Sequence, residues 1–256
     1  MKLQKKLNTI SGLTCLTLAA SPMNADGASI SLGSAGNFAV LGATTVTNTG
    51  PSLITGDLGI SPNAGTSITG FPPGIVIGTV HENNSVAIQA QEDASSAFDQ
   101  LGDAVVTQNL TGTNLGGMTL TPGVYSFDSS AMLTGNLTLD SENDPAALFI
   151  FQITSAFTAA NDAAVIGING TGASQVFFQV GSSATLGTGS RFLGTIIANE
   201  SNTLQTGATV EGRVISMTGA VTLDSNIIAI PEPSAFFLCF GGAFLCISRL
   251  NRAVSV

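Results

Sequence analysis

The chain is poor in the residues that most binding and catalytic sites require. Its 256 residues include no tryptophan, one tyrosine and one histidine, and only 9% of them are charged. Between Lys6 and Arg249 the only basic residues are Arg191 and Arg213. Because nucleic-acid binding needs several cations to neutralise phosphates, this composition argues against a nucleic-acid partner. The formal net charge of −9 suits a soluble acidic domain.

The thiols and the single imidazole are equally restricted. Cys15, Cys239 and Cys246 all lie in apolar segments at the two ends, so the intervening body has no disulfide framework, thiolate nucleophile or cysteine-based metal site. His81 precedes a helical pattern, which favours a helix-boundary or turn role over catalysis. The sequence contains no Ser-His-Asp set, phosphate loop or metal-spaced histidine pair. We therefore expect no enzyme, no bound metal and no cofactor.

One stretch of the chain repeats itself. The segment TLGTGSRFLGTIIA begins at Thr185, TLQTGATVEGRVIS begins at Thr203, and a shorter copy, TLDSNIIA, begins at Thr222, so the offsets are 18 and 19 residues. Self-similarity at a short period is typical of a solenoid, in which each copy stacks on the next. Apolar positions such as Phe192 and Val210 would form the core, and the matching threonines would stack as ladders.

The repeat extends backwards through two apolar strand patterns. When LFIFQI (148–153) is matched with QVFFQV (175–180), Gln152 falls on Gln179 and the small polar residues form two columns. The first column contains Thr158, Thr185, Thr203 and Thr222, and the second contains Asn161, Thr188, Thr206 and Ser225. These columns supply the candidate functional residues.

One segment departs from the strand-rich pattern. Between 85 and 106 the apolar residues recur mostly at steps of three and four, which is the spacing of one helical face. Asn84 or Ser85 could cap its start. The sequence therefore predicts one amphipathic helix over about 85–106, whose alanine-rich face packs along the solenoid.

The N-terminus has the composition of a secretory signal peptide. Lys2, Lys5 and Lys6 precede an apolar run, and small residues around Ala25 follow. We expect residues 1–25 to be removed and the folded domain to begin at residue 26. A short membrane anchor is the alternative.

The C-terminus combines three elements in order. Pro231-Glu232-Pro233 precedes an apolar run over 234–248, and Arg249 and Arg252 follow. The run is shorter than the roughly 20 residues that span a bilayer comfortably. This order resembles the PEP-CTERM sorting tail of Gram-negative bacteria, which is removed by an exosortase. The resemblance implies a domain over 26–230, a tail over 231–256 and a mature protein that is secreted or placed at the cell surface or matrix. A plain membrane anchor is the alternative.

Ordered blocks along the body resemble a known family. They include NFAVLGATTVTNTGPSLITGDLGISP (37–62), ITGFPPGIVIGTVH (68–81), GGMTLTPGVYSF (116–127), DPAALFIFQI (144–153) and TGATVEGRV (206–214). Together with the alanine-rich helix they resemble the microbial ice-binding protein family of bacteria, algae and fungi, over roughly 28–230. The resemblance implies a mainly β fold: a discontinuous right-handed β-helix, triangular in section, with one long α-helix alongside.

The resemblance also implies that one flat face of the β-helix binds ice. In some members this face carries a Thr-Ala/Gly-x-Thr/Asn pattern. The tetrads at 158–161 and 206–209 fit it, which adds Thr209 to the candidates, whereas the tetrad at 188–191 ends in arginine and departs from it. Because the two fitting tetrads do not share one register, the column that faces ice stays open. Arg191 and Glu211 would interrupt such a face.

The chemistry of the columns suits ice as a partner. Neighbouring coils are about 4.7–4.9 Å apart, so a threonine at one position of successive coils repeats at a nearly crystalline spacing. Each threonine offers a methyl and a hydroxyl group on a stiff β-branched frame. The interpretation is an antifreeze-like monomer that adsorbs to an ice crystal surface and contacts membrane only through its terminal segments before processing.

The sequence leaves three other interpretations. Polysaccharide lyases and hydrolases on β-helices need clustered carboxylates, but Asp140, Glu142 and Asp144 lie beside Pro145 in a predicted turn without a basic partner. Calcium could bind there or near Asp57, although a solvated acidic turn fits better. The remaining alternative is a non-catalytic structural or adhesive protein of the envelope or biofilm matrix, since threonine ladders also stabilise β-solenoids that bind nothing.

Overall fold

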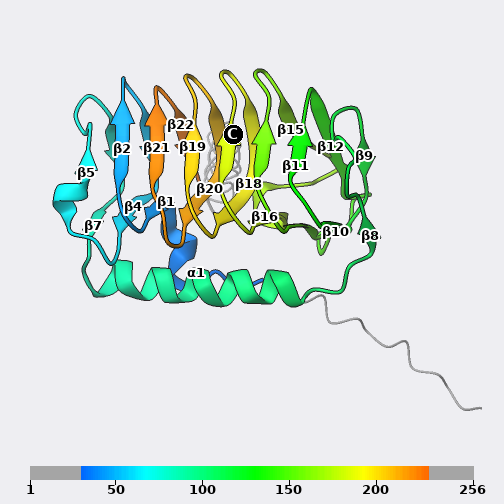
Figure 1. The fold of residues 1–256 in the computed structure, drawn as a ribbon, viewed down its shortest axis with the longest axis horizontal. Helices are drawn as coiled ribbons and strands as arrows, with labels where there is room; N and C mark the ends of the chain where they lie inside the picture. Colours follow the sequence, from blue (N-terminus) through cyan, green and yellow to red (C-terminus); the bar gives the residue numbers. More distant parts are fainter. Residues whose placement is uncertain (1–29, 231–256) are drawn as a thin grey trace, which may run out of the picture.

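The protein is a β-solenoid with one long helix beside it (Figure 1). A computed structural model describes residues 30–230, so the predicted signal peptide and sorting tail lie outside the described residues. All strand pairs are parallel, and each complete coil contributes one strand to each of three faces. None of the helices within 30–230 has the length and apolar character needed to cross a membrane.

We call the first face the threonine face. It is a seven-stranded sheet with short strands. Its order is β5 (Ile68–Thr69), β2 (Val46–Thr49), β21 (Val221–Asp224), β19 (Asn202–Leu204), β17 (Ala184–Leu186), β14 (Phe157–Ala159) and β11 (Ala131–Leu133).

The other two faces share one 15-stranded sheet. The groove face contains β6 (Ile75–Ile77), β3 (Leu53–Thr55), β22 (Ile227–Ala229), β15 (Ala164–Ile168), β12 (Asn136–Asp140), β9 (Thr119–Leu120) and the first halves of β20 (Thr209–Ser216) and β18 (Arg191–Ala198). The helix face contains the second halves of β20 and β18 with β7 (Val80–Glu82), β4 (Asp57–Ile60), β1 (Phe38–Gly42), β16 (Val176–Val180), β13 (Phe149–Ile153), β10 (Gly123–Phe127) and β8 (Gln108–Asn109).

Two glycines allow β18 and β20 to pass from the groove face to the helix face. Gly194 has a φ of 124° and Gly212 a φ of 141°, which side chains rarely adopt. A Cβ atom at Gly212 would lie 1.9 Å from the carbonyl oxygen of Gly194. The corner between these two faces therefore requires glycine.

The coils do not follow each other in chain order. The chain builds coils from β1 to β7, and the helix α1 (Ser85–Asp103) then runs along the body to the opposite end (Figure 1). The later coils return toward the start, where β20, β21 and β22 pair with β1, β2 and β3. The discontinuous arrangement expected from the family resemblance is thus present, and it joins residues about 175 positions apart in the sequence.

The helix α1 packs through a stripe of small side chains. Ala90, Ala94, Ala97 and Leu101 are buried against Phe38 and other apolar residues of the helix face. The N-cap is Asn84, one of the two predicted residues. The helix ends at Asp103 rather than near 106, because Ala104 is extended and Gln152 donates hydrogen bonds to the carbonyl oxygens of Leu101 and Ala104.

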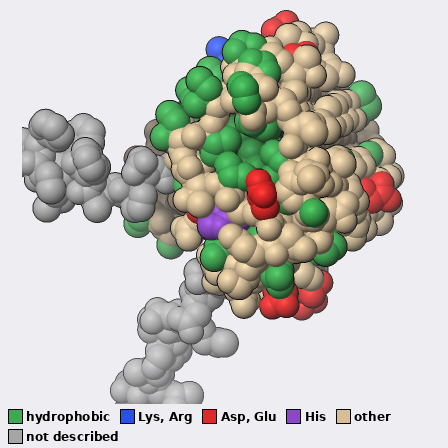
Figure 2. Space-filling model, turned by 90° about the vertical axis from the view of Figure 1, so that its left-hand side faces the viewer, with side chains coloured by type: hydrophobic (Ala, Val, Ile, Leu, Met, Phe, Trp, Pro, Cys, Tyr) green, Lys and Arg blue, Asp and Glu red, His purple; other side chains and the backbone are tan. Residues whose placement is uncertain are grey.

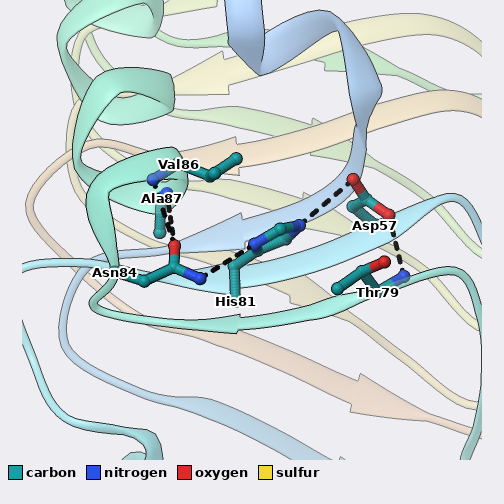
Figure 3. A network of polar contacts seen from close by, with 6 residues as sticks. All are labelled: Asp57, Thr79, His81, Asn84, Val86 and Ala87. Atoms are coloured by element: carbon teal, nitrogen blue, oxygen red, sulfur yellow. Dashed lines mark hydrogen bonds and ion pairs between the residues drawn. The ribbon is translucent and has the colours of Figure 1, made fainter.

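His81 stabilises the start of α1, as predicted for a helix-boundary residue (Figure 3). The Asn84 side-chain oxygen accepts hydrogen bonds from the backbone N–H groups of Val86 and Ala87, so its amide nitrogen faces His81 Nδ1 at 3.1 Å. His81 Nδ1 therefore accepts, and Nε2, 3.3 Å from Asp57 Oδ2, donates. The network ties the last strand before the helix to the helix cap.

The core is a stack of aromatic rings inside the coils. Phe151 and Phe178 stack with centroids 4.2 Å apart, Tyr125 stacks on Phe151, and Phe192 meets Phe178 edge to face. At the end of the solenoid that carries β5, β6 and β7, apolar side chains are visible in the centre of the terminal coil (Figure 2). At this end the two-residue β5, together with Pro72 and Pro73, hinders pairing of the sheet edge with a strand of another molecule.

Candidate functional site

The first predicted column lies in register on the threonine face. Thr158 pairs with Thr185, Thr185 with Thr203 and Thr203 with Thr222. The residues before and after each threonine are buried, so strand alternation turns the threonine side chains outward. The four side chains therefore form one straight, solvent-facing ladder.

The ladder is longer than the sequence repeat indicated. Thr222 pairs with Thr47, and Thr47 pairs with Thr69, which gives six consecutive threonines over β14, β17, β19, β21, β2 and β5. Thr47 and Thr222 bring their hydroxyl oxygens within 3.5 Å of each other. At the other end the row continues with Met132. We call the row from Thr158 to Thr69 the threonine column.

A second row of small side chains lies at the start of the same strands. The backbone N–H of Ala220 donates to Ser201 Oγ, and the backbone N–H of Ser201 donates to Ser183 Oγ. The row consists of Ala156, Ser183, Ser201, Ala220, Thr45 and Ser67. Because no side chain in this row is larger than threonine, it leaves the surface beside the threonine column flat.

The second predicted column is correct for three of its four residues. Asn161, Thr188 and Thr206 follow one another in the turns, where the backbone N–H of Thr188 donates to Asn161 Oδ1 at 3.0 Å. The next residue in this row is Asp224, whose carboxylate accepts a hydrogen bond from Thr206 Oγ1. The prediction for Ser225 is wrong, since the turn after β21 is one residue shorter than its neighbours. With a φ of 54°, Ser225 takes the left-handed turn position that Gly207 occupies in the preceding coil.

Thr209 does not join the threonine face. It begins β20 on the groove face, where it lies between Arg191 and Ile227. Ala208, which is fully buried, marks the corner that separates Thr209 from Thr206. A tetrad of the family pattern therefore straddles two faces in this coil.

The two charged residues that were expected to interrupt the ice-binding face do not lie on the threonine face. Arg191 and Glu211 belong to β18 and β20 of the groove face. They therefore do not interrupt the threonine column. Two carboxylates border the threonine column: Asp224 is the last residue of β21, and Glu200 accepts hydrogen bonds from Ser182 and Ser183 at 3.1 and 3.3 Å.

The groups with perturbed protonation lie away from the threonine face. Burial raises the pKa of the Tyr125 hydroxyl and lowers the pKa of the Arg213 guanidinium, which donates to the carbonyl oxygen of Gly36. A backbone hydrogen bond from Ser34 lowers the pKa of Asp93. Within residues 30–230, no three histidine, aspartate or glutamate side chains gather as metal ligands would. The acidic turn at Asp140 is internally bonded, with Oδ1 accepting from Glu142 N–H and from the Asn169 amide.

The comparisons with known proteins agree with this geometry. The profile of the family described as Ice-binding-like matches residues 40–229. An ice-binding protein of Nostoc sp. (strain HG1) is 47% identical over 96% of this chain and 94% of its own length.

Two solved structures are similar as well. An ice-binding protein from an Antarctic biological consortium has a TM-score of 0.77 and 42% identity, and covers 91% of this chain and 96% of its own. The ice-binding protein of the Antarctic ascomycete Antarctomyces psychrotrophicus has a TM-score of 0.76 and 41% identity, and covers 80% of this chain and 99% of its own. The chain therefore belongs to the ice-binding-like protein family.

Proposed function

We propose that this protein adsorbs to ice through the threonine face and thereby inhibits ice growth or recrystallisation. The observation that carries the proposal is the threonine column, six outward threonines on six consecutive parallel strands. The family membership and the printed names of the relatives support the same function.

The physical basis is a regular and uncharged array. Strands in a sheet are about 4.8 Å apart, so the column spans about 24 Å at a constant repeat. Stiff β-branched side chains hold each methyl and hydroxyl group in nearly the same position on every coil. Water ordered over the methyl groups and anchored by the hydroxyl groups can then merge with a growing ice lattice. Affinity comes from many weak contacts in register, and no deep pocket is needed.

The proposal includes where the protein works. The composition of residues 1–25 supports export through a signal peptide, and the order Pro231-Glu232-Pro233, apolar run, Arg249 and Arg252 supports removal of the tail by an exosortase-like sorting protease. The mature monomer over 26–230 would then act outside a Gram-negative cell, free or in the surface matrix. Mass spectrometry of the protein from its native host tests both cleavage sites.

The direct test is ice recrystallisation inhibition by purified residues 26–230, with the shape of single ice crystals observed during growth. The proposal expects suppressed coarsening and faceted crystals. Round crystals that coarsen as in buffer, from a sample shown to be folded by circular dichroism, would reject ice binding. The threonine column would then be only a stabilising ladder of a structural or adhesive protein.

A further inference from the structure

The groove face contains an open groove of about 620 Å³ between β15 and its neighbours. β15 pairs with β18 only at Ala164 and Arg191, and beyond that pair it follows β12 instead. The two strands separate there, and the floor of the groove is formed by Val165, Phe192 and Val210, which are core residues with 2–5% exposure. A volume of this size is typical of pockets that bury a small ligand or a few side chains.

The rim of the groove is apolar as well. Ile166 is 37% exposed and Ile227 is 51% exposed, and both line the groove. Contiguous exposed apolar surface on a soluble domain marks a contact site, because covering it removes apolar area from water. The threonine face lies on another side of the coils, so an occupant of this groove leaves the threonine column free.

We propose that the groove receives the start of the C-terminal segment of the same chain, residues 231–240. The described chain ends at Ile230, directly after β22, and the β22 residues Ile227 and Ala229 line the groove. The segment that follows contains Phe236, Phe237 and Leu238, whose apolar side chains match the floor of the groove. This inference concerns the chain before tail removal and does not depend on ice binding.

The length of the segment is sufficient. The groove extends over β22, β20, β18 and β15, which corresponds to about 14 Å across three strand spacings. Ten residues in extended conformation reach up to about 33 Å, so residues 231–240 can turn back from the end of β22 and cross the groove.

Charge favours the same occupant. Arg191 lines the groove, is exposed and forms no ion pair within the described residues. Glu232 is the only acidic residue after Ile230, and two extended residues plus two long side chains bring its carboxylate within reach of Arg191. Glu211, the other charged residue of the groove, would repel Glu232 and so confines the carboxylate to the Arg191 side.

A second copy of the chain fits the face less well. Eight strands and about three residues per strand give a flat area of about 35 by 10 Å. This area is below the roughly 800 Å² per partner that a stable protein interface buries.

The test uses disulfide trapping, because residues 30–230 contain no cysteine. The full-length chain with Cys15→Ser and Cys246→Ser, produced in a host without a sorting protease, keeps Cys239 as its only natural thiol. Ile166→Cys or, in a separate variant, Thr209→Cys adds a thiol at the groove. Gln89→Cys adds one on the exposed side of α1 as the matched control. Mild oxidation is followed by non-reducing electrophoresis and peptide mass spectrometry.

We expect an intramolecular disulfide to Cys239 from at least one groove position, at least fivefold more abundant than from Gln89→Cys. Arg191→Glu should reduce it severalfold, and adding Glu232→Arg should restore it. Any one of four results would overturn the proposal. Two of them are equal trapping at the control position and no trapping at either groove position. The other two are disulfides that form only between molecules and a trapping yield that Arg191→Glu does not change.

Discussion

The threonine face and the groove face are built from the same coils but present different side chains. In one coil, Thr203 points outward on the threonine face and Thr209, six residues later, lies on the groove face. The neighbours of Thr203 in its row are threonines, whereas those of Thr209 are Arg191 and Ile227.

The difference shows that the solenoid alone does not make a binding surface. Both faces are made of parallel strands of the same coils, yet only the threonine face repeats one side chain over six strands. On the groove face the rows mix apolar, charged and hydroxyl side chains, and the strands diverge. A lattice can be matched only where both the backbone and the side chains repeat.

The largest expected effect comes from charging the centre of the threonine column. The triple variant Thr185→Lys, Thr203→Lys and Thr222→Lys should lose ice recrystallisation inhibition at least about 100-fold, because about 3 kcal/mol of contact free energy corresponds to that factor. Charged groups would also hold water in their own geometry. The dilution endpoint of the recrystallisation assay measures the loss.

A matched triple variant on the groove face provides the control. Thr55→Lys, Thr138→Lys and Thr209→Lys add the same charge to another face of the same solenoid, on β3, β12 and β20. Activity should stay within twofold of the parent protein. Equal losses in both triple variants would mean that net charge, and not the threonine column, sets the activity.

The next effect concerns the corner that separates the groove face from the helix face. Gly212→Ala should lower the free energy of unfolding by more than about 2 kcal/mol, because the added Cβ atom meets the backbone of Gly194 at 1.9 Å. Gly117→Ala, at a positive φ but with open space around it, should cost only about 1 kcal/mol. Urea titration of both variants measures the difference, and similar losses would contradict the account of the corner.

A smaller effect is expected at the end of the column. Thr69 has a threonine neighbour on one side only, so Thr69→Lys should reduce activity about twofold, equivalent to roughly 0.4 kcal/mol. Thr47→Lys, with neighbours on both sides, should reduce it more. If Thr47→Lys had no effect, the two N-terminal coils would not contribute to the ice-binding surface.

The smallest expected effect is a dependence of the unfolding free energy on pH. It should arise at α1 and not at the threonine column. Asp93 of α1 accepts the Ser34 N–H at 2.6 Å, and this bond lowers the pKa of Asp93 below its usual 3.8. A depressed carboxyl pKa stabilises the folded state above the unfolded pKa, and this contribution is lost as pH falls through the folded pKa. The unfolding free energy of the parent protein should thus fall more steeply below pH 3.8 than that of Asp93→Asn.

The column itself contains no titratable group, so recrystallisation inhibition should be the same at pH 5 and pH 8. A difference between these two pH values in a folded sample would contradict an ice-contact surface without titratable groups.

Much of the later half of the fold could be predicted from the sequence. The repeats after Thr185 gave the correct register from Thr158 to Thr222, and matching Gln152 with Gln179 was confirmed. The helix was expected from its spacing, with an error of three residues at its end. These features are local or periodic, so they leave a pattern in the sequence.

The missed features depend on contacts that leave no such pattern. Thr47 and Thr69 complete the column, but Thr47 joins it by pairing with Thr222, 175 positions away, and Thr69 joins it only through its pairing with Thr47. The segments VTN at 46–48 and ITG at 68–70, with threonine between β-compatible neighbours, were the available signals. Ser225 was misplaced by a one-residue deletion in a turn, and Thr209 by a corner within the tetrad.

The most direct test compares the same substitution on two faces of one coil. Thr203→Lys and Thr209→Lys are prepared in residues 26–230, matched for folding by thermal melting and compared with the parent protein in ice recrystallisation inhibition. The account predicts that Thr203→Lys loses activity about tenfold, while Thr209→Lys keeps it. Retained activity in Thr203→Lys, or an equal loss in Thr209→Lys, would contradict the assignment of ice binding to the threonine face.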